Sequence, residues 1–292
     1  MKVGVVDIGT NSMRLLVTDG REEMGRWIEV TGLGRGLDAS GALSEEAMEN
    51  TLDALRAFGS RMDRIGVDER LAIATSASRD ASNRDHFFDQ VEEALGVRPT
   101  LISGEREGRY AFSGARAGLE LTEPLIVTDI GGGSTEFVTA SRVRSVDIGT
   151  VRLSDRSLHD RPPTADQVEQ SIAVVRSMFS DIETSQEASH VGVAGTWTSL
   201  AAIALGLDTY RKAAVHGSTL TLDDIGELVD LLLPLDLSQT RQIPSLDPRR
   251  APVILPGALI ARELMKVLGA NETIVSESDT LDGAAMELIG IA

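Results

Sequence analysis

Two stretches of the 292-residue chain carry one pattern, VVDIGTNSMRLLV at residues 5–17 and VTDIGGGSTEFVT at residues 127–139. At an offset of 122 positions they share an Asp, an Ile, a Gly and a Ser. In each stretch an apolar segment leads into Asp-Ile-Gly and a small polar turn, and a second apolar segment follows. This pattern predicts a β-hairpin closed by a glycine-containing loop. Four identities in register indicate an internal duplication, so we expect two homologous halves that divide near residue 122.

The rest of each half alternates apolar strands with amphipathic helices. Ser44 is a suitable N-cap because Glu45 and Glu46 follow it in the first turn of a helix. We expect strands at about 71–75, 100–103, 125–129, 135–140, 143–148, 190–194, 218–222 and 272–276. We expect further helices at about 87–95, 105–118, 165–183, from 196 onward, 223–233, 249–268 and 279–290. The alternation predicts an α/β protein of two similar domains, residues 1–122 and 123–292, with the last helix packing back on the first domain.

The composition excludes several classes of protein. With 28 Lys and Arg against 45 Asp and Glu, the formal net charge is −17, which is unsuited to binding nucleic acid by bulk charge. No cysteine is present, so neither disulfides nor thiolate ligands are available. No apolar run approaches the ~18 residues of a membrane span, and Asp7 interrupts the stretch where a signal peptide would be apolar. We therefore expect a cytoplasmic protein without nucleic-acid or membrane partners.

Four segments place Gly and small hydroxyl residues directly after an apolar strand. They are 7–14, 129–136, 192–199 and, more weakly, 75–83. Gly lets main-chain N–H groups converge on an anion, and Ser or Thr hydroxyls add donors. A helix beginning at Thr196 would direct its N-terminal dipole toward the same anion. One such turn is usually structural, but four in one chain favour a phosphate-binding cleft between the two domains.

The acidic residues of these loops suggest a metal ion. Asp7 and Asp129 are equivalent by the repeat, and each ends an apolar strand. A single Asp there is a common turn former. As a symmetric pair, we interpret them as holding Mg²⁺ largely through water, with Glu136 as a third acid. Glu107 opens a helix, where an acid is ordinarily favourable with the helix dipole. The four histidines show no metal-ligand spacing, and neither a P-loop nor a GxSxG motif occurs.

The motifs together resemble a known family. DIGTNSMRLLV, TSASRDASN, ISGEREGRYAF, DIGGGSTEFV, GVAGTWTSLAA and VSESDTLDG are similar, in this order, to the exopolyphosphatase/guanosine pentaphosphate phosphohydrolase family. That family belongs to the sugar kinase/actin/heat-shock-protein superfamily. The resemblance covers essentially the whole chain and implies two duplicated ribonuclease-H-like domains with an interdomain cleft. It also implies a short, two-domain member that forms a homodimer.

The resemblance implies a role for each matching residue. Glu107 falls on the position of the catalytic base, and Asp129 and Glu136 match acids associated with Mg²⁺ and the attacking water. Asp7 matches the first phosphate loop of the family, and its equivalence to Asp129 makes it the third metal residue, with Mn²⁺ as an alternative ion. The implied phosphate-binding residues are Thr10, Asn11, Ser12, Arg14, Arg79, Gly131, Gly132, Gly133, Ser134, Gly195 and Thr196.

The implied activity is hydrolysis of the terminal phosphate of inorganic polyphosphate. Hydrolysis of guanosine pentaphosphate by the same site and an ATP-dependent kinase activity stay open as alternatives. The sequence departs from the family at Arg106, where a Glu is expected, and at Gly108, where an Ala is expected. The Arg106 departure favours a third alternative, a non-catalytic sensor that binds polyphosphate or a guanosine alarmone.

Overall fold

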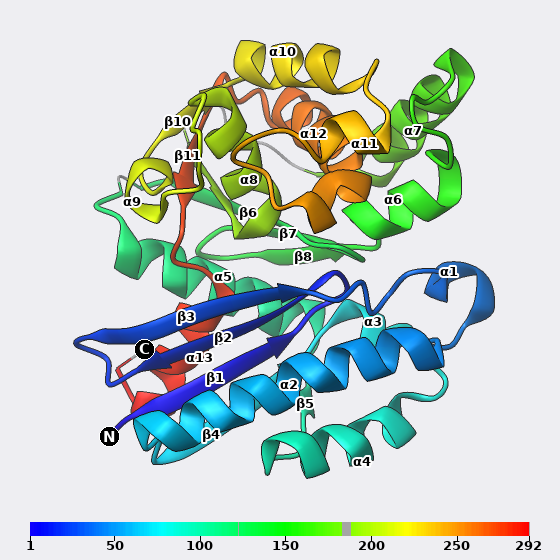
Figure 1. The fold of residues 1–292 in the computed structure, drawn as a ribbon. Coiled ribbons are helices and arrows are strands. Elements are labelled where there is room, and N and C mark those ends of the chain that lie inside the picture. The colour runs from blue at the N-terminus through cyan, green and yellow to red at the C-terminus, as the bar shows by residue number, and fades with distance from the viewer. Residues whose placement is uncertain (122, 183–187, 292) are drawn as a thin grey trace. The chain divides into compact units, whose positions relative to one another are not determined.

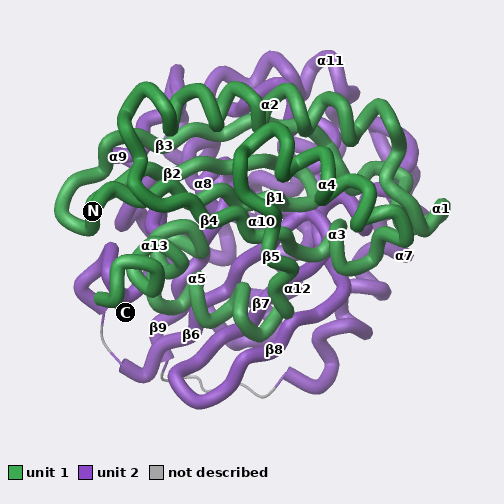
Figure 2. The backbone as a smooth tube through the Cα atoms, turned by 90° about the horizontal axis from the view of Figure 1, so that it is seen from below, with its two compact units in different colours: residues 1–114, 279–292 green, residues 115–278 purple. Residues whose placement is uncertain are grey.

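The computed structural model of the chain describes residues 1–121, 123–182 and 188–291. Within it the chain forms two units (Figure 2). Unit 1 comprises Met1–Gly114 and Asp279–Ala292, and unit 2 comprises Ala115–Ser278. The division predicted at residue 122 and the helix end predicted at residue 183 fall on positions outside the described residues. Among the described residues, no helix combines the length and the apolar composition needed to span a membrane.

Unit 1 is built on a five-stranded sheet in the order β3-β2-β1-β4-β5 (Figure 1). The central strand β1 pairs antiparallel with β2 and parallel with β4, and every residue of β1 is buried. A strand that is buried on both faces needs helices on both sides of the sheet. The bounds are β1 (Val3–Ile8), β2 (Ser12–Thr18), β3 (Glu23–Val30), β4 (Glu69–Ala74) and β5 (Thr100–Leu101).

The helices of unit 1 supply both covering layers. On one face, buried residues of α2 and α4, including Leu55 and Phe87, pack with Val6 and Leu15 of the sheet. On the other face, Leu281 of α13 joins a core that includes residues of β1, β4 and α5. Ser44 caps α2 as predicted, because its side chain accepts a hydrogen bond from the Ala47 amide. The bounds are α1 (Leu37–Ser40), α2 (Glu45–Ile65), α3 (Ser76–Asp80), α4 (Arg84–Leu95), α5 (Gly104–Gly118) and α13 (Thr280–Ile289).

Unit 2 repeats the same plan with one more strand. Its sheet runs β10-β11-β9-β6-β7-β8, so β8-β7-β6-β9-β11 repeats the order β3-β2-β1-β4-β5 of unit 1. In both units the first strand pairs antiparallel with the second and parallel with the fourth. The bounds are β6 (Leu125–Ile130), β7 (Thr135–Val138), β8 (Val143–Val146), β9 (Ser189–Val193), β10 (Thr219–Thr221) and β11 (Glu272–Ser276).

A single large core, centred on α12, holds the helices of unit 2 to its sheet. Nearly every position along α12 is buried, including Pro256 inside the helix. The helical bounds are α6 (Thr150–Ser157), α7 (Ala165–Met178), α8 (Ala194–Ala204), α9 (Lys212–Val215), α10 (Leu222–Leu232), α11 (Leu237–Thr240), η1 (Pro248–Arg250) and α12 (Ala251–Leu268).

The predicted duplicated α/β fold is confirmed by the two matching strand orders. Some local predictions differ from the structure. Segment 75–83, expected as a loop, contains the short helix α3, and α8 begins at Ala194 instead of Thr196. Ala194 has a φ of 67°, a left-handed conformation that is uncommon outside glycine, and it lies at the junction of β9 and α8. Strand β3 and helix α6 were not anticipated.

Candidate active site

The first hairpin loop follows β1 and exposes two main-chain donors. The amide of Gly9 donates to the carbonyl of Ser12 at 3.2 Å, which closes the turn between β1 and β2. The amides of Thr10 and Asn11 donate no hydrogen bond to any residue that the structure describes. The Thr10 hydroxyl accepts from the Ala77 amide at 3.2 Å and so fixes the first turn of α3. This loop therefore offers N–H groups for an anion and also anchors the helix that carries Arg79.

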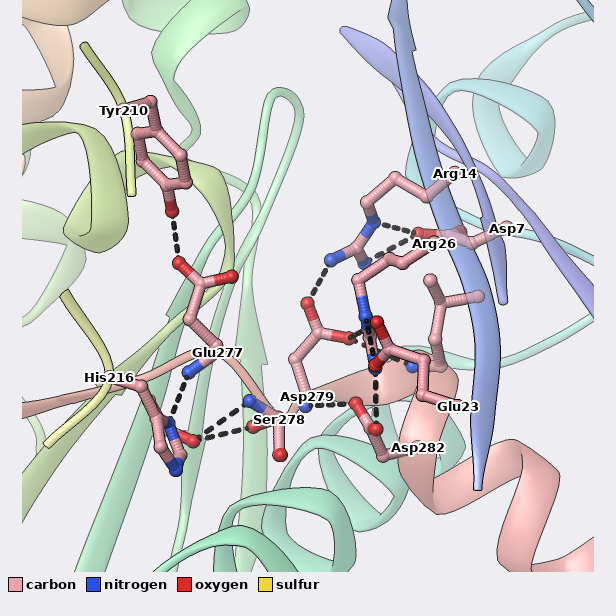
Figure 3. A network of polar contacts seen from close by, with 12 residues as sticks. Asp7, Arg14, Glu23, Arg26, Tyr210, His216, Glu277, Ser278, Asp279 and Asp282 are labelled. Carbon is pink, nitrogen blue, oxygen red and sulfur yellow. Dashed lines mark hydrogen bonds and ion pairs between the residues drawn. The ribbon is translucent and has the colours of Figure 1, made fainter. Parts of the chain in front are cut away.

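Arg14 and Asp7 face each other across the hairpin, because they are register partners on β2 and β1. Nε and Nη2 of Arg14 donate to Oδ2 of Asp7 at 3.0 and 2.6 Å. Nη1 of Arg14 forms a second ion pair, with Asp279 at the start of α13 (Figure 3). Burial raises the pKa of Asp7 and Arg14 acts against that rise. The guanidinium is thus held from two sides, at the point where the loop amides are free.

A second ion pair joins α3 to α5. Nη1 of Arg79 donates to Oε2 of Glu107 at 2.9 Å and to the carbonyl of Ile102 at 3.0 Å. The Glu107 side chain is only 13% exposed. Burial raises the pKa of Glu107 to about 7, the nearby charge of Asp7 adds to the rise, and the guanidiniums of Arg79 and Arg14 oppose it. A carboxylate with a pKa near 7 is suited to accept a proton from water at neutral pH.

The charges of this group favour a cation. Arg14 pairs with Asp7 and Asp279, and Arg79 pairs with Glu107, so three carboxylates accompany two guanidiniums. Oδ1 of Asp7 is buried and has no hydrogen-bond partner among the described residues. An oxygen of this kind suits a hard divalent ion. The described residues contain no group of three or more His, Cys, Asp or Glu arranged as a metal cage. Asp7 therefore offers one buried oxygen to a divalent cation.

The second hairpin loop, in unit 2, repeats the first. The Gly131 amide donates to the carbonyl of Ser134 at 3.0 Å, as its counterpart does in unit 1. The carbonyls of the loop point toward the start of α6, whose amides at Thr150 and Val151 donate to Gly131 and Gly132. The amides of Gly132 and Gly133 donate to no residue within the described ranges. This loop therefore presents free N–H groups at the positions equivalent to Thr10 and Asn11.

Two buried carboxylates lie opposite each other behind this loop. Asp129 and Glu136 are register partners on β6 and β7, so their side chains lie on the same face of the sheet. Asp129 is 4% exposed and Glu136 is fully buried. The hydroxyl of Ser145 donates to Oε1 of Glu136 at 2.6 Å. Two neighbouring carboxylates are a common arrangement for a divalent cation.

The third predicted loop, between β9 and α8, serves mainly as a support. The Thr196 hydroxyl donates to the carbonyl of Ile130 at 2.7 Å, which ties α8 to the strand that carries Asp129. A Cβ at Gly195 would lie 1.9 Å from Nη1 of Arg250, so only glycine allows this guanidinium to lie against the start of α8. Trp197 is fully buried and packs edge-on against His190. Its indole therefore belongs to the core of unit 2.

The structure groups the predicted site residues by unit. In unit 1 it brings together Asp7, Thr10, Asn11, Ser12, Arg14, Arg79 and Glu107. In unit 2 it brings together Asp129, Gly131, Gly132, Gly133, Ser134, Glu136, Gly195 and Thr196. Sequence reasoning missed Asp279, although the segment VSESDTLDG was among the matching motifs. The available signal was the pair Asp279 and Asp282 at the start of a helix, which reads as an ordinary cap.

Arg106, the departure from the family pattern, points away from the base. Its guanidinium pairs with Glu287 of α13 and lies 5.4 Å from the centre of the Tyr110 ring. Nε of Arg106 donates to the Tyr110 hydroxyl at 2.9 Å. The Arg106 side chain is 54% exposed, whereas that of Glu107 is largely enclosed. The substitution therefore changes a contact between α5 and α13 and leaves the Arg79–Glu107 pair intact.

Comparisons with known proteins agree over nearly the whole chain. Residues 17–288 match the model of the Ppx/GppA phosphatase family. Exopolyphosphatase 2 of Mycobacterium tuberculosis is 35% identical over an alignment of 315 positions, which covers 99% of each protein. A crystal structure of an exopolyphosphatase-like protein is 31% identical, with a TM-score of 0.95 and 99% of both chains covered. The Aquifex aeolicus PPX-GPPA enzyme is 30% identical, with a TM-score of 0.81, and the match covers 98% of this chain and 99% of that one.

Proposed function

The chain belongs to the Ppx/GppA phosphatase family, and from this premise we propose that it is an exopolyphosphatase that releases orthophosphate from the end of inorganic polyphosphate. The proposal takes its substrate from the name of the Mycobacterium tuberculosis relative. Its mechanism is supported by one observation in unit 1. A buried carboxylate, Glu107, is held by Arg79 and has a pKa raised to about 7, close to the Asp7–Arg14 pair.

Glu107 is the general base in this proposal. Its carboxylate accepts a proton from a water molecule as the water oxygen attacks the terminal phosphorus. The bond between that phosphorus and the bridging oxygen breaks, and orthophosphate leaves the shortened chain. Arg79 orients the carboxylate through its 2.9 Å hydrogen bond. Because the same guanidinium opposes the rise in pKa, it keeps the base partly ionised at neutral pH.

The remaining site residues bind the phosphate groups. In unit 1 the free amides of Thr10 and Asn11 and the Arg14 guanidinium provide donors, with Ser12 beside them. In unit 2 the free amides of Gly132 and Gly133 provide a second set, which Gly131, Ser134 and the Gly195–Thr196 turn support. Donors that are fixed before the substrate binds stabilise the charge that develops during phosphoryl transfer.

We propose Mg²⁺ as the cofactor. Asp7 is the candidate ligand in unit 1, and the Asp129–Glu136 pair is the candidate ligand set in unit 2. The ion would neutralise phosphate oxygens, which the carboxylates around Arg14 cannot do. Mn²⁺ has the same preference for oxygen ligands. The homodimer and the cytoplasmic location predicted from the sequence stay proposals.

One alternative loses the feature that favoured it. The sensor interpretation rested on Arg106, whose side chain contacts Tyr110 and Glu287 and leaves the base undisturbed. A kinase would need a nucleoside pocket beside the start of α8, and Trp197 of α8, which is part of the core, does not decide for or against such a pocket. Guanosine pentaphosphate remains the competing substrate, because its terminal phosphate would meet the same base and the same loops.

The test is phosphate release from long-chain polyphosphate and from guanosine pentaphosphate, side by side, with Mg²⁺ or EDTA. The proposal expects Mg²⁺-dependent release from polyphosphate that exceeds release from the nucleotide at least tenfold in kcat/KM. Preference for the nucleotide would assign the same site to alarmone hydrolysis. Binding of polyphosphate without release from either substrate would contradict the enzymatic proposal and restore the sensor.

A further inference from the structure

The carboxylate of Asp279 makes two contacts with different purposes. Oδ1 accepts a hydrogen bond from the Leu281 amide at 3.0 Å, so Asp279 is the N-cap of α13. Oδ2 accepts from Nη1 of Arg14, at a sequence separation of 265 residues. The side chain is 8% exposed, so both contacts are largely shielded from water. A residue that served only as a cap would not need the second contact.

Arg14 is held by this contact on the side that Asp7 does not reach. Nε and Nη2 of Arg14 donate to Asp7, and Nη1 donates to Asp279 (Figure 3). Both hydrogen bonds that Arg14 donates to Asp7 end on a single oxygen, Oδ2, so these two bonds by themselves do not stop the guanidinium from pivoting about that atom. A contact at Nη1 removes this freedom. The pair of carboxylates therefore fixes both the position and the plane of the guanidinium.

Asp279 is itself held in place by contacts with its neighbours in unit 1. A Cβ at Gly114 would lie 2.0 Å from the carbonyl oxygen of Asp279, so the backbones of α5 and α13 touch at this point. The Asp279 amide donates to Oδ2 of Asp282 at 2.8 Å. Nη2 of Arg26, on β3, donates to Oδ1 of Asp282 at 2.6 Å, and Nη1 of Arg26 lies 4.0 Å from Oδ1 of Asp279. The start of α13 is thus locked to α5 and to the sheet.

We infer that Asp279 is a positioning residue that holds the Arg14 guanidinium in the orientation required for phosphoryl transfer. The inference rests on the proposed role of Arg14 in binding phosphate. Misplacing a charge-stabilising group by about 1 Å can cost up to ~10²-fold in rate. Removal of the Asp279 charge also leaves Arg14 less neutralised, so the polyanion itself is bound at least as tightly. The two effects act in different directions on kcat and on KM.

The test is Asp279→Asn, because Asn caps a helix as well as Asp does. We expect kcat for polyphosphate to fall about tenfold while KM stays equal or decreases. Glu287→Gln is the matched control on the same helix, because it removes an ion pair with Arg106 of α5 but touches neither Arg14 nor Asp279. This control should stay within threefold of wild type, and thermal unfolding should show that both variants are folded.

A double-mutant cycle separates positioning from general damage to the fold. In an Arg14→Lys background the planar guanidinium that Asp279 orients is absent, so Asp279→Asn should reduce kcat by less than threefold further. Equal losses in the two backgrounds, equal losses for Asp279→Asn and Glu287→Gln, or a raised KM would each overturn the inference. Absence of phosphate release by the wild-type protein would instead overturn the proposed function, and the positioning role with it.

Discussion

The two hairpins, β1–β2 in unit 1 and β6–β7 in unit 2, have the same backbone and different chemistry. Each closes with one hydrogen bond from the glycine after Asp-Ile to the carbonyl of the serine, at 3.2 and 3.0 Å. In each, the two amides inside the loop are free within the described ranges. The Asp at the end of the first strand is 4% exposed in both copies.

The copies differ at the residue opposite that Asp. In unit 1 the register partner of Asp7 is Arg14, and in unit 2 the partner of Asp129 is Glu136, 122 positions further along the chain. The first copy therefore neutralises its carboxylate with a guanidinium, whereas the second places two carboxylates together. Both copies keep a loop with two free amides, and one side chain per copy decides whether a guanidinium or a second carboxylate lies opposite the Asp.

The largest expected effect tests whether catalysis belongs with the first copy. Glu107 is influenced by Asp7 and Arg14, both of the first hairpin. Glu107→Gln removes the base and should reduce phosphate release by at least about 10²-fold. Polyphosphate binding, measured by calorimetry, should change by less than threefold. Glu105→Gln, on the exposed side of α5 beside Arg109, is the control and should stay within twofold. A Glu107→Gln variant within threefold of wild type would exclude Glu107 as the base.

Removing the side-chain charge opposite each Asp should have a different effect on thermal unfolding in each copy. Arg14→Gln leaves two buried carboxylates without their guanidinium and should cost about 3 kcal/mol, or roughly 6–12 °C in the first thermal transition. Glu136→Gln removes one of two neighbouring acids and should reduce the rise in unfolding temperature that added Mg²⁺ gives. An unchanged response to Mg²⁺ in Glu136→Gln, measured by scanning calorimetry, would contradict the chemical distinction between the copies.

The pH dependence of the rate should report Glu107. A general base works in its ionised form, so with a pKa of about 7 the value of kcat/KM should rise with pH and level off above that point. Well below pH 7 it should fall about tenfold for each unit. Arg79→Gln removes a charge that lowers this pKa. In this variant the fall of kcat/KM on the acidic side should therefore occur about one pH unit higher. Arg98→Gln, an exposed arginine paired with Asp89, is the control and should keep the wild-type profile. An unchanged limb in Arg79→Gln would argue against Glu107 as the titrating group.

The smallest effect is expected outside both hairpins. Arg106→Glu restores the residue typical of the family, but the side chain it replaces is 54% exposed and contacts Tyr110 and Glu287. Stability should fall by no more than about 1 kcal/mol, as for an exposed ion pair. Phosphate release should stay within threefold of wild type for both candidate substrates. A tenfold change in their ratio would show that α5 and α13 together influence specificity.

Local signals were sufficient to predict much of the fold. The helix start at Ser44 and the strand 272–276 follow from capping and apolar patterning, and the structure confirms both. Strand β3 was missed because its sequence, EMGRWIEV, lacks a clear alternation of apolar and polar residues. Most of its residues are half-buried in the structure. Helix α3 was read as a loop because its first turn depends on the Thr10 hydroxyl, which is distant in sequence.

The candidate site shows more clearly that local patterns do not predict contacts between residues distant in sequence. The loop residues carry a recognisable pattern because their chemistry depends on neighbours in sequence. The role inferred for Asp279 depends on a contact with Arg14 across nearly the whole chain, and its own neighbourhood reads as an ordinary helix cap. The sequence also could not predict where the Arg106 side chain points, because its direction is set by the packing of α13 against α5.

The placement of α13 in unit 1 has a consequence for synthesis on the ribosome. Leu281, Ala284 and Ala285 complete the core that covers Val3 and Val5 of the first strand. The first strand is synthesised more than 270 residues before its cover, so that face of the sheet stays open while the intervening chain is added. Unit 1 is therefore dependent on a helix that leaves the exit tunnel long after its central strand, and a nascent chain that stalls before Leu281 displays an uncovered apolar sheet to chaperones and proteases.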